Sequence, residues 1–335
     1  MPEQRYQNLK PSLGPGEKGV VVIHPDPDSM ASAWALKLLF KKHKSTADIA
    51  IYEPIKRIDN RTMVKLLRLP LVNYKDIKLE NYTRLCLVDA QPNQFPEVSP
   101  EKWHIVIDHH PVYPECNCQF TDIRPELGAT STMMDQYLTQ ARVRITERIA
   151  TALCYGIMTD TDNFQRNMTK EDAQAFSHLF PHVNYRLLQV IEQTEIPFKQ
   201  LQYFDLALHR LEVEKRRAVI HIGATESPDI AVMLADFFIR VSGIQFVCVS
   251  CISGDKLYII FRSRNMRKDA GKIASSHFND IGSAGGHKAA ARAEIPLDNL
   301  PDDVMLYSPD SIEAFIEKSL SKKPGRPPKA SGENS

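Results

Sequence analysis

Residues 20–36 read VVVIHPDPDSMASAWAL and join an apolar run to a helical pattern through an acidic turn. The run up to Ile23 is β-branched and apolar, which favours a buried strand. His24, Asp26 and Asp28 follow it directly. Carboxylates at the end of a buried strand repel one another and lose hydration unless something pairs with them, and a bound cation is the simplest partner. The alternative is an ordinary strand-to-helix turn in which Asp28 caps the helix and His24 is incidental.

The first half of the chain repeats this alternation of strand and helix. Such a βαβ order predicts an α/β fold with a mostly parallel sheet and helices on both faces. The expected strands are 19–24, 47–53, 83–90 and 103–110, and the expected helices are 29–43, 128–141 and 146–160.

The second half has more closely spaced strands and predicts a smaller α+β domain. Its expected strands are 216–225, 244–252, 256–264 and one within 283–297, with helices at 229–241, 269–278 and 310–320. The predicted domain plan is a disordered N-terminus at 1–18, a first domain at 19–195, a helical linker at 196–215, a second domain at 216–320 and a disordered basic tail at 321–335.

Composition bounds the class of protein. Acidic and basic residues nearly balance at a net charge of +1, so general affinity for long duplex DNA is not indicated. The N-terminus lacks the apolar core of a signal peptide, and no apolar run reaches membrane-spanning length. The expected location is therefore the cytoplasm, with no membrane partner.

Acidic and imidazole side chains recur at the carboxyl ends of the expected strands. In open α/β sheets the ligand crevice lies beyond those ends, so segments far apart in the sequence meet there. Carboxylate oxygens with one or two imidazoles suit Mg²⁺ or Mn²⁺ better than they suit a thiolate-bound metal. The sequence therefore predicts a divalent-metal site from His24, Asp26 and Asp28 after the first strand, Asp89 in LVDA, Asp108, His109 and His110 in VIDHH, and Asp160 in GIMTD.

At these residues the chain resembles a known family. HPDPDSMASA, LVDAQP, VIDHHP and GIMTDTDNF resemble the four motifs of the DHH phosphoesterases, and FRSRNMRKDAGKIASSHFNDIGSAGGHKAAA resembles the glycine-rich segment of the DHH-associated domain. The resemblance covers about residues 18–318. It implies a metal-binding DHH domain, a DHH-associated substrate-binding domain and an active site in the cleft between them. It also implies two Mn²⁺ (or Mg²⁺) ions that activate a water molecule.

The resemblance assigns a role to each matched residue. Asp26 would bind one ion and Asp28 the other, and Asp89 would bridge both. His109 and Asp160 would complete the shell of the second ion, His110 would lie near the substrate phosphate or in the shell, and Asp108 would orient a histidine.

One position departs from the family pattern. In the oligoribonuclease and pyrophosphatase branches a histidine four residues before the first Asp binds the first ion, and here that position is Val22. His24 lies two residues later, and alternate residues of a strand face the same way. His24 is therefore predicted as a replacement ligand, with the alternative that it only hydrogen-bonds nearby groups.

The second domain would bind the substrate. Arg262 and Arg264 end a strand and are predicted to hold a phosphate or a terminal carboxylate, although surface arginines commonly end strands. Gly285, Gly286 and His287 lie in a turn whose bare backbone can approach an anion. The family pattern has a third glycine before the histidine, and here that residue is Ala284.

The leading prediction is a metal-dependent phosphoesterase, an exonuclease-type hydrolase, that acts on short oligonucleotides (nanoRNA) or 3′,5′-bisphosphonucleotides. The alternatives within the fold are a cyclic-dinucleotide phosphodiesterase and a polyphosphatase. The alternative from another class is a nucleotide-binding regulatory module with a degraded metal site. The Gly-Arg-Pro sequence in the tail suggests a weak DNA contact, and a homodimer is left open.

Overall fold

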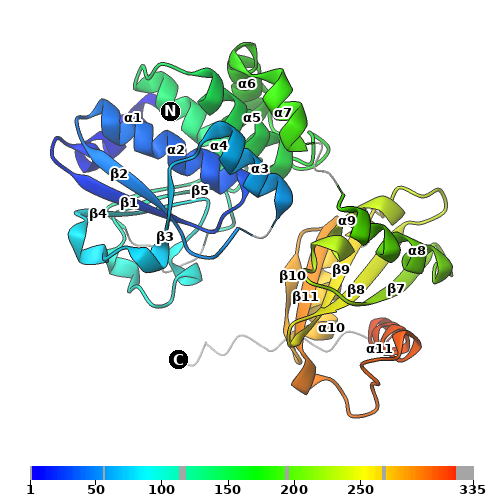
Figure 1. Ribbon diagram of the computed structural model, residues 1–335. Helices are drawn as coiled ribbons and strands as arrows, with labels where there is room; N and C mark the ends of the chain where they lie inside the picture. Colours follow the sequence, from blue (N-terminus) through cyan, green and yellow to red (C-terminus); the bar gives the residue numbers. More distant parts are fainter. Residues whose placement is uncertain (1, 56, 113–117, 193–195, 266–268, 322–335) are drawn as a thin grey trace, which may run out of the picture. The chain divides into compact units, whose positions relative to one another are not determined.

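The computed structural model describes residues 2–55, 57–112, 118–192, 196–265 and 269–321 (Figure 1). The chain divides into two compact units, Met1–Thr194 and Glu195–Ser335, and each is described by itself. Of the tail predicted at 321–335, all but Ser321 lies outside the described residues. Within the described part of the chain, no helix is long and apolar enough to cross a membrane.

The first unit contains a six-stranded sheet in which every pair of neighbours is parallel, as predicted. The strand order is β3-β2-β1-β4-β5-β6, so the chain crosses over β1 to begin the second half of the sheet. The sequence did not reveal β3 and β6, which are short edge strands. The strands are β1 (Lys18–Ile23), β2 (Thr46–Ile51), β3 (Leu71–Asn73), β4 (Arg84–Val88), β5 (Ile105–Asp108) and β6 (Phe120–Ile123).

Alternating side chains of β1 feed two separate apolar cores, one on each face of this sheet. Val21 and Ile23 pack against α-helices, whereas Val20 and Val22 pack on the opposite face against Phe95 and other residues of the connecting segments. That opposite face is covered by 3₁₀ helices within 74–102. The α-helices are α1 (Pro2–Leu9), α2 (Pro27–Lys42), α3 (Ile58–Leu67), α4 (Thr130–Gln140), α5 (Glu147–Asp160), α6 (Lys170–Leu179) and α7 (Tyr185–Glu192).

The N-terminal segment corrects one prediction, because residues 1–18 were expected to be disordered. Helix α1 is followed by a 3₁₀ turn, and Tyr6, Leu9 and Leu13 are buried in the helix-side core. The Tyr6 hydroxyl lies 2.9 Å from His43 Nε2 at the end of α2. The three apolar residues are spaced three and four apart, so they share one helical face that the Pro- and Gly-rich composition concealed.

The second unit contains a five-stranded mixed sheet in the order β10-β11-β9-β8-β7, in which only β7 and β8 are parallel. Helices α8 and α9 share an apolar core with one face of this sheet, and α10 and α11 share a core with the other. The elements are α8 (Leu201–His209), β7 (Arg217–Ala224), α9 (Asp229–Phe238), β8 (Phe246–Ser253), β9 (Lys256–Ser263), α10 (Ala270–Phe278), β10 (Ser283–Gly286), β11 (Ala290–Pro296) and α11 (Pro309–Ser321).

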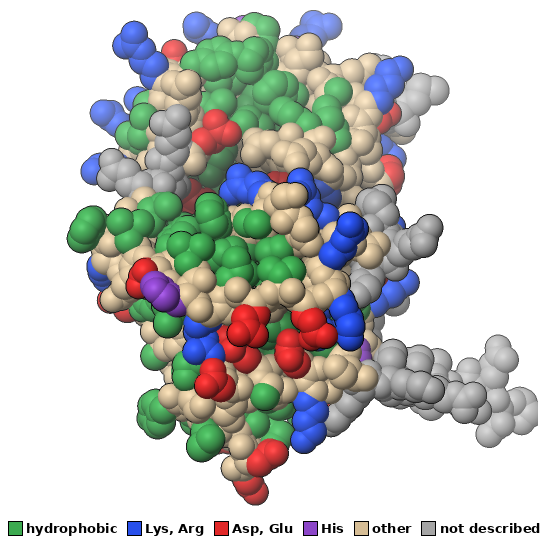
Figure 2. Space-filling model, turned by 90° about the vertical axis from the view of Figure 1, so that its right-hand side faces the viewer, with side chains coloured by type: hydrophobic (Ala, Val, Ile, Leu, Met, Phe, Trp, Pro, Cys, Tyr) green, Lys and Arg blue, Asp and Glu red, His purple; other side chains and the backbone are tan. Residues whose placement is uncertain are grey.

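Helix α8 corrects the predicted linker at 196–215. It ends at His209, and its Ala207 is fully buried in the core of the second unit, so the segment is part of that unit rather than a free connector. Figure 2 shows apolar side chains gathered on one face of the molecule. Leu201 and Leu208 of α8 and Phe237 of α9 are exposed apolar side chains of this unit.

Candidate metal centre

The turn after β1 places two carboxylates at the start of α2. Asp26 is the N-cap residue, and its side chain accepts a hydrogen bond of 2.8 Å from Ser29 N. The helix cap considered for Asp28 therefore belongs to Asp26. Asp28 lies in the first turn of the helix and is completely buried.

The carboxylate of Asp28 is held by the N-terminus of α4. Thr130 N donates to Oδ2 and Ser131 N donates to Oδ1, each at 2.7 Å. Ala129, the residue before α4, has no side chain that can cap the helix, so Asp28 satisfies these N–H groups from another part of the chain. Burial and the charge of Asp160 raise the pKa of Asp28 to about 6.

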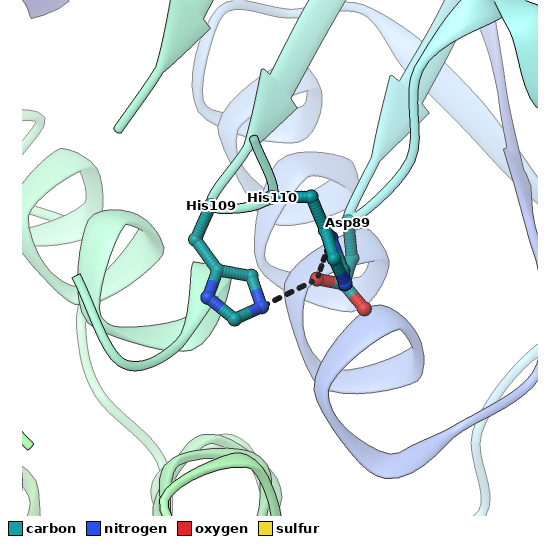
Figure 3. Close-up of side chains that lie close together, drawn as sticks. All are labelled: Asp89, His109 and His110. Atoms are coloured by element: carbon teal, nitrogen blue, oxygen red, sulfur yellow. Dashed lines mark ion pairs between the residues drawn. The ribbon is translucent and has the colours of Figure 1, made fainter. Parts of the chain in front are cut away.

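Asp89 follows β4 in a left-handed backbone conformation with a φ of 57°. Its Oδ1 accepts a hydrogen bond of 3.0 Å from Thr130 Oγ1 and lies 3.4 Å from His109 Nε2 and 3.8 Å from His110 Nδ1 (Figure 3). Burial and the neighbouring carboxylates raise the pKa of Asp89 well above its usual value. Without a cation, this group of acids therefore resists full ionisation.

The two histidines after β5 are oriented by different partners. His109 Nδ1 lies 3.2 Å from Leu127 O, which directs Nε2 toward Asp160, and Nε2 lies 3.0 Å from Asp160 Oδ2. His110 Nδ1 lies 2.8 Å from Asp108 Oδ1. Burial alone lowers the pKa of His109, but the Asp160 and Asp28 carboxylates raise this pKa to about 9 in the metal-free protein.

Four side chains from four segments bring ligand atoms within 4.8 Å of one another: Asp28, Asp89, His109 and Asp160. A second, overlapping group is Asp89, His109 and His110. His109 Nε2 is buried and, despite its distance of 3.0 Å from Asp160 Oδ2, has no hydrogen bond of normal geometry. Three carboxylates and a buried imidazole nitrogen that faces them without a hydrogen bond of normal geometry fit a divalent cation with oxygen and nitrogen ligands.

The topology of the sheet explains why these residues meet. The strand order changes direction between β1 and β4, and Asp28 and Asp89 follow the carboxyl ends of these two neighbouring strands. A crevice at such a switch point is the usual ligand site of open α/β sheets. His109 follows the next strand, β5, and Asp160 ends α5, which packs against α2.

In the second unit, Arg262 lies on β9 and lines a pocket of about 260 Å³ with Gly285, Gly286 and Arg292. Its guanidinium forms two contacts with Asp236, at 2.6 and 3.3 Å. Gly286 has a φ of 141°, and a Cβ there would lie 2.6 Å from Ala290 O, so this position requires glycine. At Gly285 a Cβ would meet nothing within 4 Å, so space alone does not demand glycine there.

The other two predicted substrate residues lie on the surface of the same unit. Arg264 is exposed, and its backbone N–H donates to Gln245 O at 2.9 Å. His287 is also exposed, and its backbone joins the β10–β11 turn to Gly271 at the start of α10. Their contact with substrate stays a prediction.

Comparison with known protein families identifies the domain type of the first unit. Residues 18–157 match the DHH family, N-terminal domain. This segment is a DHH domain. It contains Asp28, Asp89 and His109, and Asp160 follows three residues after its end.

Proteins with sequences similar to this chain include longer ones. An uncharacterised protein of Methanocaldococcus jannaschii is 34% identical over 276 residues, which is 82% of this chain and 57% of that protein. An A-adding tRNA nucleotidyltransferase of Geobacter sulfurreducens is 26% identical over 68% of this chain and 27% of its own length. The chain therefore spans about half or less of the length of these relatives.

A solved structure shares the fold of nearly the whole chain. It is an exopolyphosphatase-related protein from Bacteroides fragilis, with a TM-score of 0.76 and 18% identity, and the match covers 95% of this chain and 96% of that one. At this identity the likeness establishes the fold, including the smaller domain that follows the DHH domain.

Two predicted ligands of the DHH domain lie outside both groups of metal-ligand atoms. His24 Nδ1 lies 3.4 Å from Glu53 Oε1, and its ring stacks on Phe95 with a centroid distance of 4.8 Å. Asp26 uses its carboxylate to cap α2, although its charge is close enough to raise the pKa of Asp89. Their roles as ligands stay predictions.

Sequence reasoning missed the residues that hold the candidate metal ligands and Asp108 in place. Gln91 Nε2 donates to Asp108 Oδ2 at 2.6 Å, and Thr130 and Ser131 hold Asp28 and Asp89. Gln91 lies within LVDAQP, one of the quoted motifs, so its position was a usable signal. Thr130 and Ser131 act mainly through backbone N–H groups, which residue types do not reveal.

Proposed function

We propose that this protein is a divalent-metal-dependent phosphoesterase that hydrolyses short oligonucleotides or small nucleotides. The observation that carries the proposal is the convergence of Asp28, Asp89, His109 and Asp160, whose ligand atoms lie within 4.8 Å of one another. A structural role alone leaves three buried or half-buried carboxylates facing one another, which is unfavourable without a cation.

The same residues define how the site would work. Asp28, Asp89, His109 and Asp160 would hold one ion, and Asp89 with Asp26 and, if it turns inward, His24 would hold a second. Bound Mn²⁺ or Mg²⁺ supplies a Lewis acid for the phosphate and lowers the pKa of a water molecule. The hydrogen bond with Asp108 raises the pKa of His110, so a protonated His110 would donate from Nδ1 to Asp108 and from Nε2 to a substrate phosphate oxygen.

Two observations favour nucleotide-type substrates. A-adding tRNA nucleotidyltransferases of Geobacter sulfurreducens and Aquifex aeolicus contain a region similar to this chain, so related sequences occur within proteins named for action on a nucleic acid. In the second unit, the Arg262 pocket with its glycine-lined wall suits a small anionic group. Cyclic dinucleotides and polyphosphate are the alternative substrates.

One observation favours a second candidate, a nucleotide-binding regulatory module. Val22 is buried in the core at the position where a family histidine would bind the first ion, and His24 pairs with Glu53. A first ion site that lacks this imidazole would bind metal weakly, and the domain would then bind a nucleotide without hydrolysing it.

A substrate panel separates these candidates. Metal-depleted protein is incubated with Mn²⁺ or Mg²⁺ and a labelled dinucleotide, a 3′,5′-bisphosphonucleoside, cyclic dinucleotides or polyphosphate. We expect hydrolysis of the dinucleotide or the bisphosphonucleoside that EDTA abolishes. Exclusive hydrolysis of cyclic dinucleotides or polyphosphate would establish an alternative activity, and tight nucleotide binding without any turnover would establish the regulatory module.

A matched pair of variants ties the activity to this site. Asp28, Asp89, His109 and Asp160 are called the metal group below. Asp160→Asn removes a carboxylate of this group, whereas Asp162→Asn changes an exposed carboxylate two residues later in the turn. Asp162 has a φ of 49°, which asparagine tolerates well. We expect Asp160→Asn to abolish hydrolysis and Asp162→Asn to retain it. Equal activity of the two variants would contradict the proposed site.

A further inference from the structure

The segment 127–132, which leads into α4, contacts three of the four residues of the metal group. It therefore determines where their ligand atoms lie. Its contacts are Leu127 O to His109 Nδ1 at 3.2 Å, Thr130 Oγ1 to Asp89 Oδ1 at 3.0 Å, and the N–H groups of Thr130 and Ser131 to Asp28 at 2.7 Å each.

The buried carboxylate of Asp172 holds this segment at two points. Gly128 N donates to Asp172 Oδ2 at 2.9 Å, and Thr132 Oγ1 donates to Asp172 Oδ1 at 2.6 Å. The two residues that hold Asp28 thus lie between the two residues that Asp172 holds. Asp172 is completely buried and belongs to neither group of metal-ligand atoms.

Capping of α6 accounts for only part of this arrangement. Asp172 is the N3 residue of a capping box with Thr169, whose N–H and hydroxyl donate to Oδ2 at 2.8 and 2.6 Å. A capping box needs no partner outside its own helix. The bonds to Gly128 and Thr132 span 44 and 40 residues, and hydrogen bonds to an ionised carboxylate are stronger than neutral ones.

Close packing at Gly128 makes this contact direct. A Cβ at Gly128 would lie 2.8 Å from Asp172 Oδ2, 2.8 Å from Thr161 Cγ2 and 3.0 Å from Asn167 O. Only glycine lets the backbone come this near to the carboxylate. The start of α4 is therefore fitted to Asp172 on one side and to the metal group on the other.

We infer that Asp172 is a positioning residue of the metal centre, which it controls through the segment 127–132. This inference rests on the proposed function for its relevance to metal binding, but the positioning itself is measurable without metal. Outer groups that orient metal ligands typically change metal affinity or activity 10- to 100-fold when they are removed.

The test compares Asp172→Ala with Thr169→Ala. Thr169→Ala removes the capping hydroxyl of α6 but leaves both long-range bonds of Asp172 intact. Thr132→Val serves as a second variant because it removes one long-range bond and leaves the capping box whole, so it remains informative if Asp172→Ala does not fold. Each full-length protein is measured by hydrogen exchange without metal and by calorimetric titration with Mn²⁺ alone.

We expect Asp172→Ala to accelerate amide exchange at Thr130 and Ser131 at least tenfold and to weaken Mn²⁺ binding roughly 10- to 100-fold. Thr132→Val shifts both quantities in the same direction by at least threefold, and Thr169→Ala leaves both within twofold. Unchanged exchange in Asp172→Ala and Thr132→Val, or equal effects in Thr169→Ala, would overturn the inference. Absence of Mn²⁺ binding by the unmodified protein would overturn the proposed function instead, and the exchange rates would still decide the positioning role.

Discussion

His110 Nδ1 lies 2.8 Å from Asp108 Oδ1, and Asp108 is completely buried at the end of β5. Gln91 Nε2 donates to the other carboxylate oxygen at 2.6 Å. Burial alone raises the pKa of Asp108, but the hydrogen bond from His110 outweighs this effect together with the other neighbours, so the pKa is lowered. Asp108 belongs to neither group of metal-ligand atoms and contacts His110 directly, which suits a residue that orients the histidine.

Asp108→Asn tests this orientation. The amide has nearly the same size, but only one of its two polar atoms accepts a hydrogen bond, so His110 and Gln91 no longer both keep their present bonds. We expect kcat to fall about 10- to 100-fold while Mn²⁺ binding changes less than kcat. Steady-state kinetics and a calorimetric Mn²⁺ titration measure the two effects. A variant with unaltered kcat would show that the pair has no part in the reaction.

Asp89→Asn tests the residue shared by the two groups of metal-ligand atoms. Asparagine tolerates the positive φ of this position, so the fold should survive. Because burial and neighbouring carboxylates raise the pKa of Asp89, the neutral side chain relieves repulsion in the metal-free protein. We expect a higher melting temperature without metal, no further rise with Mn²⁺ and a loss of activity above about a hundredfold, which exceeds the effect of an outer group. A normal Mn²⁺-induced rise would contradict the shared-ligand role.

His24→Ala decides between the two interpretations of His24. In the structure its ring stacks on Phe95 and meets Tyr52 edge-on, so its removal should lower the free energy of unfolding by about 1 kcal/mol. We expect the number of Mn²⁺ ions bound per chain to stay the same, as measured by elemental analysis of the dialysed protein. The loss of one ion per chain would instead establish the replacement ligand that the sequence predicts.

Arg262→Ala tests the pocket of the second unit. If the guanidinium binds a substrate phosphate, its loss removes a charge-assisted contact and raises KM about tenfold, with kcat within about threefold. Asp236→Asn is the matched control, because it weakens the ion pair that holds Arg262 but keeps the guanidinium. We expect the KM of this control to be no higher than that of the unmodified protein. If Arg262→Ala leaves KM unchanged, the arginine only stabilises the fold.

His221 predicts a pH dependence of stability in the second unit. It is buried beside Ser250, and burial together with the charge of Arg210 lowers its pKa to about 4, below the usual value of 6.5. Below pH 6.5 His221 becomes protonated in the unfolded chain, whereas in the folded chain it stays neutral down to about pH 4. The free energy of unfolding therefore falls across this window by up to about 3 kcal/mol.

Urea unfolding at several pH values measures this effect. His221→Gln should flatten the dependence between pH 6.5 and 4, whereas His209→Gln, which changes a largely exposed histidine of α8, should retain it. Identical slopes in His221→Gln and in the unmodified protein would show that other groups cause the dependence.

The convergence of Asp28, Asp89, His109 and Asp160 was predictable because each lies near the end of a strand or helix in a recognisable βαβ order. Asp28, Asp89 and His109 follow strands, and strand ends of a parallel sheet meet along one edge. The roles of Thr130 and Asp172 were not predictable, because hydroxyl groups, backbone N–H groups and capping carboxylates occur at the start of most helices. Their importance depends on which partner the fold brings near, and these partners are about 40 to 100 residues away.

The fold was predictable to a similar extent. The central strands were predictable from their β-branched apolar runs. Strands β3 and β6 are too short to show the two-residue alternation of a strand. The spacing argument also placed Val22 and His24 on the same side of the sheet, and both contact the core that contains Phe95. What it could not supply was the identity of that neighbour, because Phe95 comes from a connecting segment without regular periodicity.

The donors that satisfy Asp28 are made long after Asp28 itself. Thr130 and Ser131 follow it by 102 and 103 residues, and a ribosome adds roughly 5–20 residues per second. For on the order of ten seconds, the nascent chain therefore presents the acidic turn after β1 without the amides that later surround it. Translation therefore sets the earliest moment at which the carboxylate of Asp28 can exchange water for these two amide donors.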